Sequence, residues 1–433
     1  MYRKEYTETI FRTGSHTSRK SSVKQHEMAA LREMEQMILA AEAVPAGAEA
    51  LERATAHLEQ FLQQVRQKRI LDEKQRAMEA FRQQFENGYT WRNGFLRNVA
   101  RFGDREALIE PESGTVWTYT QLNAEANRLS HALLRAGLQK GDVVMVQLHN
   151  CPEFVFAYLA CHKTGMVFCP VNFRLSAKEI TDCIDNSRPK VFLLEPETQA
   201  EVDMALRRTA HAPQILLTTD ARAAHAYAGF TADCPATEPE LPWELSVYDE
   251  TLRLFTSGTT GRQKSVCLTS INEVLSAHDV MIHFPFSFTD RSMNTTPWFH
   301  RGGLHSGGIT PTLYAGGTVI IQRKFQPEKT LDMVQQYGLT FLIGVPNVLE
   351  LLAEAQQKQP RDLSSLRGIV TMGSPLERAD CIRYQKILTK RIFNGYGTTE
   401  TFWNTFLRPD DLPEMAGSAG RSCVDDDVRV IKV

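Results

Sequence analysis

The sequence predicts an α/β protein with a largely parallel sheet, because short apolar runs that suit strands alternate with longer stretches of helical periodicity from about residue 90 onward. Strands and helices that alternate at this spacing form parallel sheets with helices packed on their faces. The expected strands are 143–148, 167–171, 190–194, 317–321, 339–343, 368–372, 391–393 and 428–433, and the expected helices include 154–163, 328–337 and 347–357.

Two N-terminal segments differ from this main body. Residues 1–25 are polar, and we expect a flexible tail. Residues 26–86 carry apolar side chains mostly three or four positions apart, which predicts a helix with one apolar stripe. The stretch Val44-Pro45-Ala46-Gly47 interrupts the run, since proline and glycine both break helices. We therefore predict a helical hairpin over 26–86, which either only packs or serves as a docking or dimerisation arm, and a main domain over 87–433.

Composition excludes several classes of protein. The chain has 49 Lys and Arg against 51 Asp and Glu, a balance that argues against a protein that coats nucleic acid. No apolar stretch reaches the roughly 18 residues that a membrane-spanning helix needs. The eight cysteines lack the short spacing of zinc sites, so we expect reduced thiols in a cytoplasmic protein.

The most informative segment is 254–266, in which a strand end runs into a loop of hydroxyl residues and glycines with a lysine. Glycines let backbone amides approach a ligand closely, and successive amides form an anion-binding nest. Lys264 adds a positive charge suited to a polyphosphate. Gln263 stands before this lysine, so the spacing is not that of a P-loop.

A second segment, 394–400, directly follows a predicted strand, and ligands bind at the carboxyl ends of strands in open α/β sheets. An aromatic ring such as that of Tyr396 can stack on a nucleobase, a hydroxyl can donate to phosphate, and a carboxylate such as that of Glu400 can hold Mg²⁺. A third segment, 297–308, sets His300 beside paired glycines and suggests a pocket wall, although a lone histidine is more often structural.

Taken together and in this order, these segments resemble the adenylate-forming superfamily, which includes acyl-CoA synthetases, aryl-CoA ligases, nonribosomal adenylation domains and luciferases. The resemblance runs from about residue 90 to the end of the chain. It is supported by 117–122, 137–171, 344–346, 372–376 and 417–421.

The resemblance implies the large N-terminal domain of that superfamily, built of stacked, mostly parallel sheets and helices, without the small C-terminal domain. It implies that the 256–261 loop and Lys264 order the ATP β- and γ-phosphates. Tyr396 would lie against the adenine, opposite the backbone of 373–375, and Thr399 would contact the α-phosphate. The implied nucleotide-binding set is Thr256, Ser257, Gly258, Thr259, Thr260, Gly261, Lys264, Gly373, Ser374, Pro375, Tyr396, Gly397, Thr398 and Thr399.

The implied reaction joins a carboxylic acid to a thiol at the expense of ATP. The carboxylate attacks the α-phosphate to give an acyl adenylate and pyrophosphate, and the thiol of CoA, or of a carrier protein, then takes the acyl group. The resemblance makes Glu400 the ligand of Mg²⁺ and places His300 near the carboxylate. The implied catalytic residues are Lys264, His300, Thr399 and Glu400, and the implied substrate-binding residues are Trp298, His300, Gly303, Val345 and Trp403.

The chain departs from the family pattern in two places. Gln263 and Ser265 stand where the family usually has proline and glycine. Beyond 417–421, the family's ribose-binding aspartate, hinge and lysine-bearing small domain cannot be assigned, so we expect weak ATP binding and little turnover by this chain alone. The alternative is a non-catalytic nucleotide-binding or assembly protein that docks, or forms a homo-oligomer, through 26–86.

Overall fold

The computed structural model describes residues 32, 36, 47–257 and 263–431 of the 433. The chain divides into two compact units, 1–81 and 82–433. In the first unit, α3 (Gly47–Phe81) is one continuous helix. The tail and nearly all of the predicted first hairpin helix lie outside the described residues, so the hairpin and its boundaries remain predictions.

The predicted single apolar stripe does not run along α3. Leu58 and Leu71 stand 13 positions apart, and a helix of 3.6 residues per turn puts them roughly 220° apart around the axis. Leu58 and Val65 are half-buried, whereas Leu71 and Met78 are 64% and 55% exposed. The apolar residues of α3 therefore fall on two different faces.

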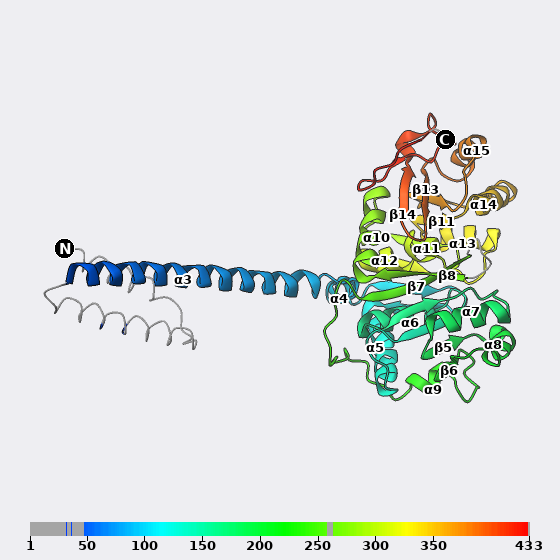
Figure 1. Cartoon of the computed structure of the whole chain (residues 1–433). Coiled ribbons are helices and arrows are strands. Elements are labelled where there is room, and N and C mark those ends of the chain that lie inside the picture. Colours follow the sequence, from blue (N-terminus) through cyan, green and yellow to red (C-terminus); the bar gives the residue numbers. More distant parts are fainter. Residues whose placement is uncertain (1–31, 33–35, 37–46, 258–262, 432–433) are drawn as a thin grey trace. The chain divides into compact units, whose positions relative to one another are not determined.

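The second unit contains two sheets, and Figure 1 shows sheet A toward the α14–α15 end and sheet B toward the α8–α9 end. Sheet A has nine strands in the order β15-β14-β13-β12-β11-β9-β10-β1-β2. Its central strands, from β13 to β1, are parallel, while β2, β14 and β15 add antiparallel edges. The strands are β1 (Glu106–Glu110), β2 (Thr115–Thr118), β9 (Arg291–Asn294), β10 (Thr318–Ile320), β11 (Phe341–Gly344), β12 (Gly368–Met372), β13 (Ile392–Thr398), β14 (Phe402–Leu407) and β15 (Arg421–Ser422).

Sheet B has six strands in the order β6-β5-β3-β4-β7-β8, all parallel except β8, which pairs antiparallel with β7. The predicted α/β class with mostly parallel sheets is confirmed. The strands are β3 (Val143–Gln147), β4 (Val167–Pro170), β5 (Val191–Leu194), β6 (Ile215–Thr218), β7 (Glu250–Ser257) and β8 (Gln263–Thr269).

Helices cover both faces of the sheets, and short helical turns lie at Arg82–Glu86, Pro196–Thr198 and Pro409–Asp411. The helices are α4 (Trp91–Phe102), α5 (Tyr119–Arg135), α6 (Pro152–Thr164), α7 (Ala177–Ser187), α8 (Gln199–Leu206), α9 (Tyr227–Thr231), α10 (Ser270–His283), α11 (Arg301–His305), α12 (Ile309–Ala315), α13 (Pro327–Tyr337), α14 (Pro346–Lys358) and α15 (Arg378–Ile387).

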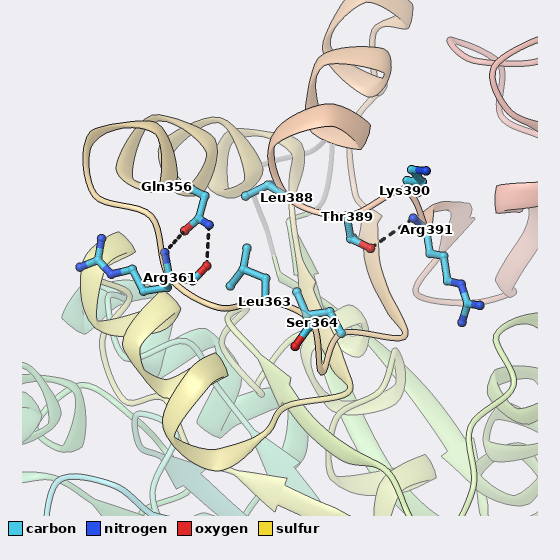
Figure 2. A pocket seen from close by; sticks show the side chains of 9 residues that line it. Gln356, Arg361, Leu363, Ser364, Leu388, Thr389, Lys390 and Arg391 are labelled. Carbon is cyan, nitrogen blue, oxygen red and sulfur yellow. Dashed lines mark hydrogen bonds between the residues drawn. The ribbon is translucent and has the colours of Figure 1, made fainter.

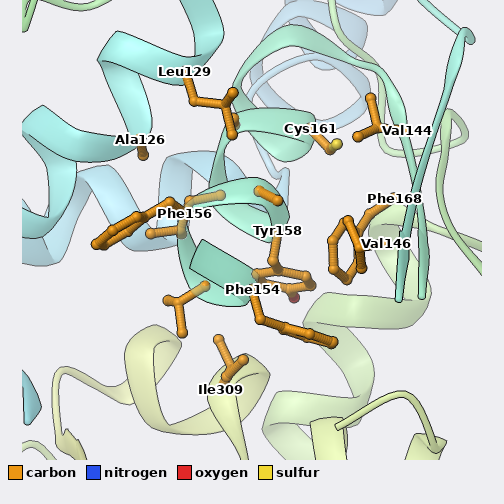
Figure 3. Close-up of a cluster of buried hydrophobic side chains, with 14 of the residues drawn as sticks. Ala126, Leu129, Val144, Val146, Phe154, Phe156, Tyr158, Cys161, Phe168 and Ile309 are labelled. Carbon is orange, nitrogen blue, oxygen red and sulfur yellow. The ribbon is translucent and has the colours of Figure 1, made fainter. Parts of the chain in front are cut away.

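Alternating side chains of β3 show why this strand forms and how the layers stack. All five residues of β3 are buried, as expected of a parallel strand covered on both faces. Val144 and Val146 point into the core that α5, α6 and α12 share between the sheets (Figure 3). Val143 and Met145 point the other way, toward α7 and α8. The far face of sheet A is covered by α13, α14 and α15.

The predicted strand at 428–433 is wrong over its described part. Residues 426–431 have no regular structure, and Val430 and Ile431 are strongly exposed. Sheet A ends instead at Arg421–Ser422, which pairs with β14. Alternating apolar residues at 428–431 give a strand pattern, but no strand among the described residues pairs with them.

Candidate active site

The hydroxyl-and-glycine loop is the tip of the β7–β8 hairpin. Thr256 pairs directly with Lys264, and Ser257 with Gln263. Because β7 runs parallel to β4, this tip lies at the carboxyl edge of sheet B, where open α/β sheets bind ligands. Lys264 is exposed, while Gly258, Thr259, Thr260 and Gly261 lie outside the described residues.

The second predicted segment forms the end of β13 and the turn into β14. Tyr396 is 57% exposed, and a bulge in the ladder follows it. A Cβ on Gly397 would lie 1.4 Å from the carbonyl oxygen of Phe402, so only glycine fits there. Phe402 itself adopts a left-handed φ of 65°, which is strained for a bulky residue. The turn therefore depends on its surroundings for its shape.

Threonine hydroxyls close this turn from within. The amide of Thr398 donates to the Thr401 hydroxyl over 3.3 Å, and the amide of Thr401 donates to the Thr398 hydroxyl over 3.2 Å. The Thr401 hydroxyl also donates to Asn404 Oδ1 over 2.8 Å. Thr399 is half-buried and Glu400 is exposed at the tip of the turn.

The third segment folds back tightly on itself before α11. A Cβ on Gly303 would lie 2.1 Å from the carbonyl oxygen of Pro297, so this glycine is required by packing. The ring of His300 tilts against that of Phe299, with 4.1 Å between the centroids. Desolvation lowers the pKa of His300, although its side chain reaches the surface, and favours the neutral imidazole.

Packing brings this segment beside the carboxyl ends of β11 and β12. A Cβ on Gly302 would lie 3.0 Å from Sδ of Met372, the last residue of β12. The next residue, Gly373, has a φ of 83°, and a Cβ there would lie 3.7 Å from Cγ1 of Val345. The structure thus gathers the second and third segments and 372–375, of which Ser374 and Pro375 are exposed, at the carboxyl edge of sheet A.

Two of the predicted substrate-binding residues are buried in the core. Trp298 is 1% exposed and lies 5.6 Å from Phe154 between ring centroids. Trp403 is 3% exposed and packs on Phe402 and Phe406. Both rings support neighbouring elements, and their predicted contact with a substrate stays a prediction.

A buried polar cluster joins His305 of the 297–308 segment to Glu273 of α10. Nε2–H of His305 donates to Glu273 Oε1 over 2.8 Å, and the hydroxyls of Tyr158 and Thr310 donate to Glu273 Oε2 over 2.7 and 3.3 Å. Burial alone would raise the pKa of Glu273, but these partners outweigh it and hold that pKa well below its usual range. Burial lowers the pKa of nearby His162 to about 4. Glu273 is therefore an anion with several donors at neutral pH.

The carboxylate of Glu400 fits the predicted magnesium ligand. It is exposed and forms no hydrogen bond or ion pair with any described residue. The described residues contain no cluster of three or more His, Cys, Asp or Glu that could hold a metal. One free carboxylate suits Mg²⁺, which is commonly bound by one or two carboxylates together with substrate phosphates.

One cavity of about 420 Å³ lies elsewhere in the fold (Figure 2). Thr389, Lys390 and Arg391 line it just before β13 begins, and Leu366 lines it just before β12. It is therefore at the amino edge of sheet A, opposite the carboxyl edge that gathers the predicted site residues.

Sequence and structure comparisons show the family of the chain. The family model described as AMP-binding enzyme matches residues 95–433, so the chain belongs to that family. It is similar to the indoleacetate–CoA ligase of Aromatoleum aromaticum (strain DSM 19018 / LMG 30748 / EbN1), with 31% identity over 337 residues, 76% of this chain and 65% of that protein. It also resembles a feruloyl-CoA synthase of an Amycolatopsis species, with 31% identity over 335 residues, 75% of this chain and 64% of that protein.

The chain thus spans slightly less than two thirds of the length of these curated relatives. Among solved structures, it matches the N-terminal domain of FACL13 from Mycobacterium tuberculosis with a TM-score of 0.70 and 25% identity, over 77% of this chain and 83% of that chain. The predicted family and fold are therefore confirmed. Within the described part of the chain, no helix is long and apolar enough to cross a membrane.

Sequence reasoning missed two residues of this region, Arg301 and Thr401. Thr401 closes the turn that carries Glu400. Arg301 follows His300 directly, and its guanidinium reaches the same turn. The sequence carries no local signal for Arg301, because its bond to the Glu400 carbonyl joins positions 99 apart in the chain.

Proposed function

We propose that this chain binds ATP at the carboxyl edges of its two sheets and activates a carboxylic acid as its acyl adenylate, the first step of an AMP-forming CoA ligase. The observation that carries this proposal is the gathering of the Glu400 turn, His300 and Gly373 at one edge of sheet A. The β7–β8 hairpin with Lys264 supplies a phosphate-binding element at the corresponding edge of sheet B.

In the reaction, a carboxylate oxygen of the acid forms a bond to the α-phosphorus of ATP, and pyrophosphate leaves with the electrons of the broken P–O bond. Lys264 neutralises charge on the β- and γ-phosphates, the hydroxyls of the hairpin donate hydrogen bonds to them, and Thr399 contacts the α-phosphate. Tyr396 presents an exposed ring on which adenine can stack. Such a displacement asks the protein mainly for positioning and charge neutralisation.

Glu400 would hold Mg²⁺, which when bound neutralises phosphate charge. Neutral His300 supplies a hydrogen bond at the acid rather than a second positive charge. In the second step, the sulfur of a thiol attacks the acyl carbon and AMP leaves. We propose CoA as this thiol, because both similar proteins described above are named for CoA, and a carrier-protein thiol is the alternative.

The proposed acid is apolar and aromatic. The rings of Phe299 and Phe173 meet edge to face with 5.6 Å between centroids, next to His300. Aromatic side chains in this arrangement favour a flat apolar ligand. The names of the two similar proteins, which refer to indoleacetate and ferulate, point the same way.

ATP binding and ATP–pyrophosphate exchange test the function. We expect the chain to bind Mg·ATP weakly in calorimetry and to catalyse slow exchange with indoleacetate or ferulate. Lys264→Ala and Glu400→Gln are each expected to weaken Mg·ATP binding roughly tenfold or more, since a charge-assisted contact is worth about 1.5–3 kcal/mol. Lys358→Ala, at an exposed lysine near the end of α14, serves as the control and should bind as the unmodified chain does. Equal binding by all three variants would refute the assignment.

A second candidate function, assembly through the N-terminal helices, is favoured by the exposure of Leu71 and Met78 on α3. We propose a second copy of the chain as the partner. Sedimentation of the purified chain over a range of concentrations is expected to show a dimer that Leu71→Asp together with Met78→Asp dissociates. A monomer at every concentration would remove this candidate.

We propose the cytoplasm as the compartment. All eight cysteines are free, and seven of them are buried. Unpaired thiols persist where the environment is reducing.

A further inference from the structure

Arg301 is a buried cation at the start of α11, next to His300. Its side chain is 7% exposed, and burial lowers its pKa to about 10, so that it stays charged at neutral pH. Burying a guanidinium costs free energy, which hydrogen bonds from its donors offset. Two of the three nitrogens of Arg301 are bonded, and Nε has no hydrogen-bond partner among the described residues. The use of those donors therefore indicates what the residue does.

The donors of Arg301 reach two other elements. Nη1 donates to the backbone carbonyl of Thr399 and, over 3.2 Å, to that of Glu400. Nη2 donates to the hydroxyl of Ser276 on α10 over 3.1 Å. The guanidinium carbon also lies 5.2 Å from the centroid of the Phe402 ring. One side chain thus fastens the Glu400 turn to α10 and α11.

The charge of Arg301 is not consumed by an ion pair. No carboxylate among the described residues lies within ion-pair distance of its guanidinium, and its hydrogen bonds go to carbonyls and a hydroxyl. Glu273, Asp279 and Glu400 act on it through longer-range electrostatics and favour its charged form. A cation beside the Thr399 and Glu400 carbonyls also favours the phosphates that these residues would meet.

The turn needs such a support. Phe402 adopts a left-handed φ of 65°, and strain of this kind persists only where the surroundings over-determine the backbone. Within the turn, the described hydrogen bonds of Thr398 and Thr401 close the loop but do not connect it to the helices. Among the side chains described here, Arg301 makes that connection to α10.

We propose that Arg301 is a positioning residue for nucleotide activation: its guanidinium holds the Thr399 and Glu400 carbonyls and so sets where the Glu400 carboxylate meets Mg·ATP. This inference rests on the proposed function for its ligand. The hydrogen bonds between Arg301 and the turn do not depend on the nucleotide, and they can be tested in its absence.

The test compares Arg301→Gln and Arg301→Lys in the full chain. Arg301→Gln is expected to raise the Mg²⁺ concentration for half-maximal ATP–pyrophosphate exchange about tenfold while the KM for the acid changes less than twofold. Arg301→Lys keeps the positive charge but lacks the forked donors of the guanidinium. It should raise the Mg²⁺ concentration for half-maximal exchange about threefold. The control is Arg92→Gln, at an arginine half-buried beside Glu238 in another part of the fold, which should leave the Mg²⁺ requirement unchanged.

Amide hydrogen exchange without nucleotide gives the second readout. The amides of Thr398 and Thr401 should exchange at least tenfold faster in Arg301→Gln, while those of β12 keep their rates. A lower Tm with unchanged Mg²⁺ dependence and unchanged amide rates would overturn the proposal. If the unmodified chain shows no exchange with any acid, the proposed function fails, and the amide rates alone then decide whether Arg301 fastens the turn. A wild-type profile for Arg301→Lys in both readouts would also overturn the proposal.

Discussion

Replacing Glu273 by leucine is expected to lower the free energy of unfolding of the main domain by about 4 kcal/mol, which corresponds to a fall in Tm of roughly 10 °C. The change keeps the volume but removes the acceptor of three buried donors, on His305, Tyr158 and Thr310. Breaking a buried charged network by removing one partner is costly, because the others stay desolvated without partners. Differential scanning calorimetry measures the change.

Two further variants control this measurement. Glu273→Gln keeps an acceptor and loses the charge, so we expect about half the loss of stability. Glu354→Leu changes an exposed glutamate on α14 and should leave Tm within about 1 °C of the unmodified chain. A Tm of the Glu273→Leu chain equal to that of the Glu354→Leu chain would show that the cluster does not stabilise the fold.

Gly397→Ala is expected to abolish measurable ATP binding, a loss of at least about a hundredfold, while most of the fold persists. A Cβ 1.4 Å from the Phe402 carbonyl oxygen forces the two strands apart at the start of the turn. Thr399 and Glu400 move with the turn, so both of their expected contacts with Mg·ATP are lost together, each worth about 1.5–3 kcal/mol. Calorimetric titration with Mg·ATP, together with a thermal melt, separates lost binding from lost folding.

The matched control is Gly229→Ala on α9, where an added Cβ meets no atom within 4 Å. This substitution should leave ATP binding unchanged and raise stability slightly, because alanine favours a helix over glycine by up to about 1 kcal/mol. If the Gly397→Ala chain binds ATP as tightly as the Gly229→Ala chain does, the turn does not position the nucleotide.

Much of the fold was predictable from sequence, because parallel strands buried on both faces appear as continuous apolar runs. The predicted strands at 143–148 and 368–372 match β3 and β12 within a residue. The prediction failed where a strand needs a partner: residues 428–431 alternate like a strand, but no strand in the described part of the chain pairs with them. On α3, local spacing of three and four predicted one stripe, yet the register shift between Val65 and Leu71 moves the apolar face around the helix.

The candidate site was predictable in its parts but not in its connections. Glycine and hydroxyl patterns identified the hairpin at 256–264 and the turn at 396–400, since their chemistry is local. The bond between Arg301 and the carbonyl of Glu400 joins positions 99 apart in the chain, and no local pattern encodes such a contact. The burial of Trp298 and Trp403 has the same cause, because an aromatic residue near a motif can face either the core or a pocket.

The very short β15, only Arg421 and Ser422, bears on how the molecule behaves at high concentration. The open edge of a sheet is a template on which another chain can add a strand and start aggregation. A strand of only two residues offers few free backbone groups to a second chain. This end of sheet A is thereby protected against edge-to-edge association between molecules.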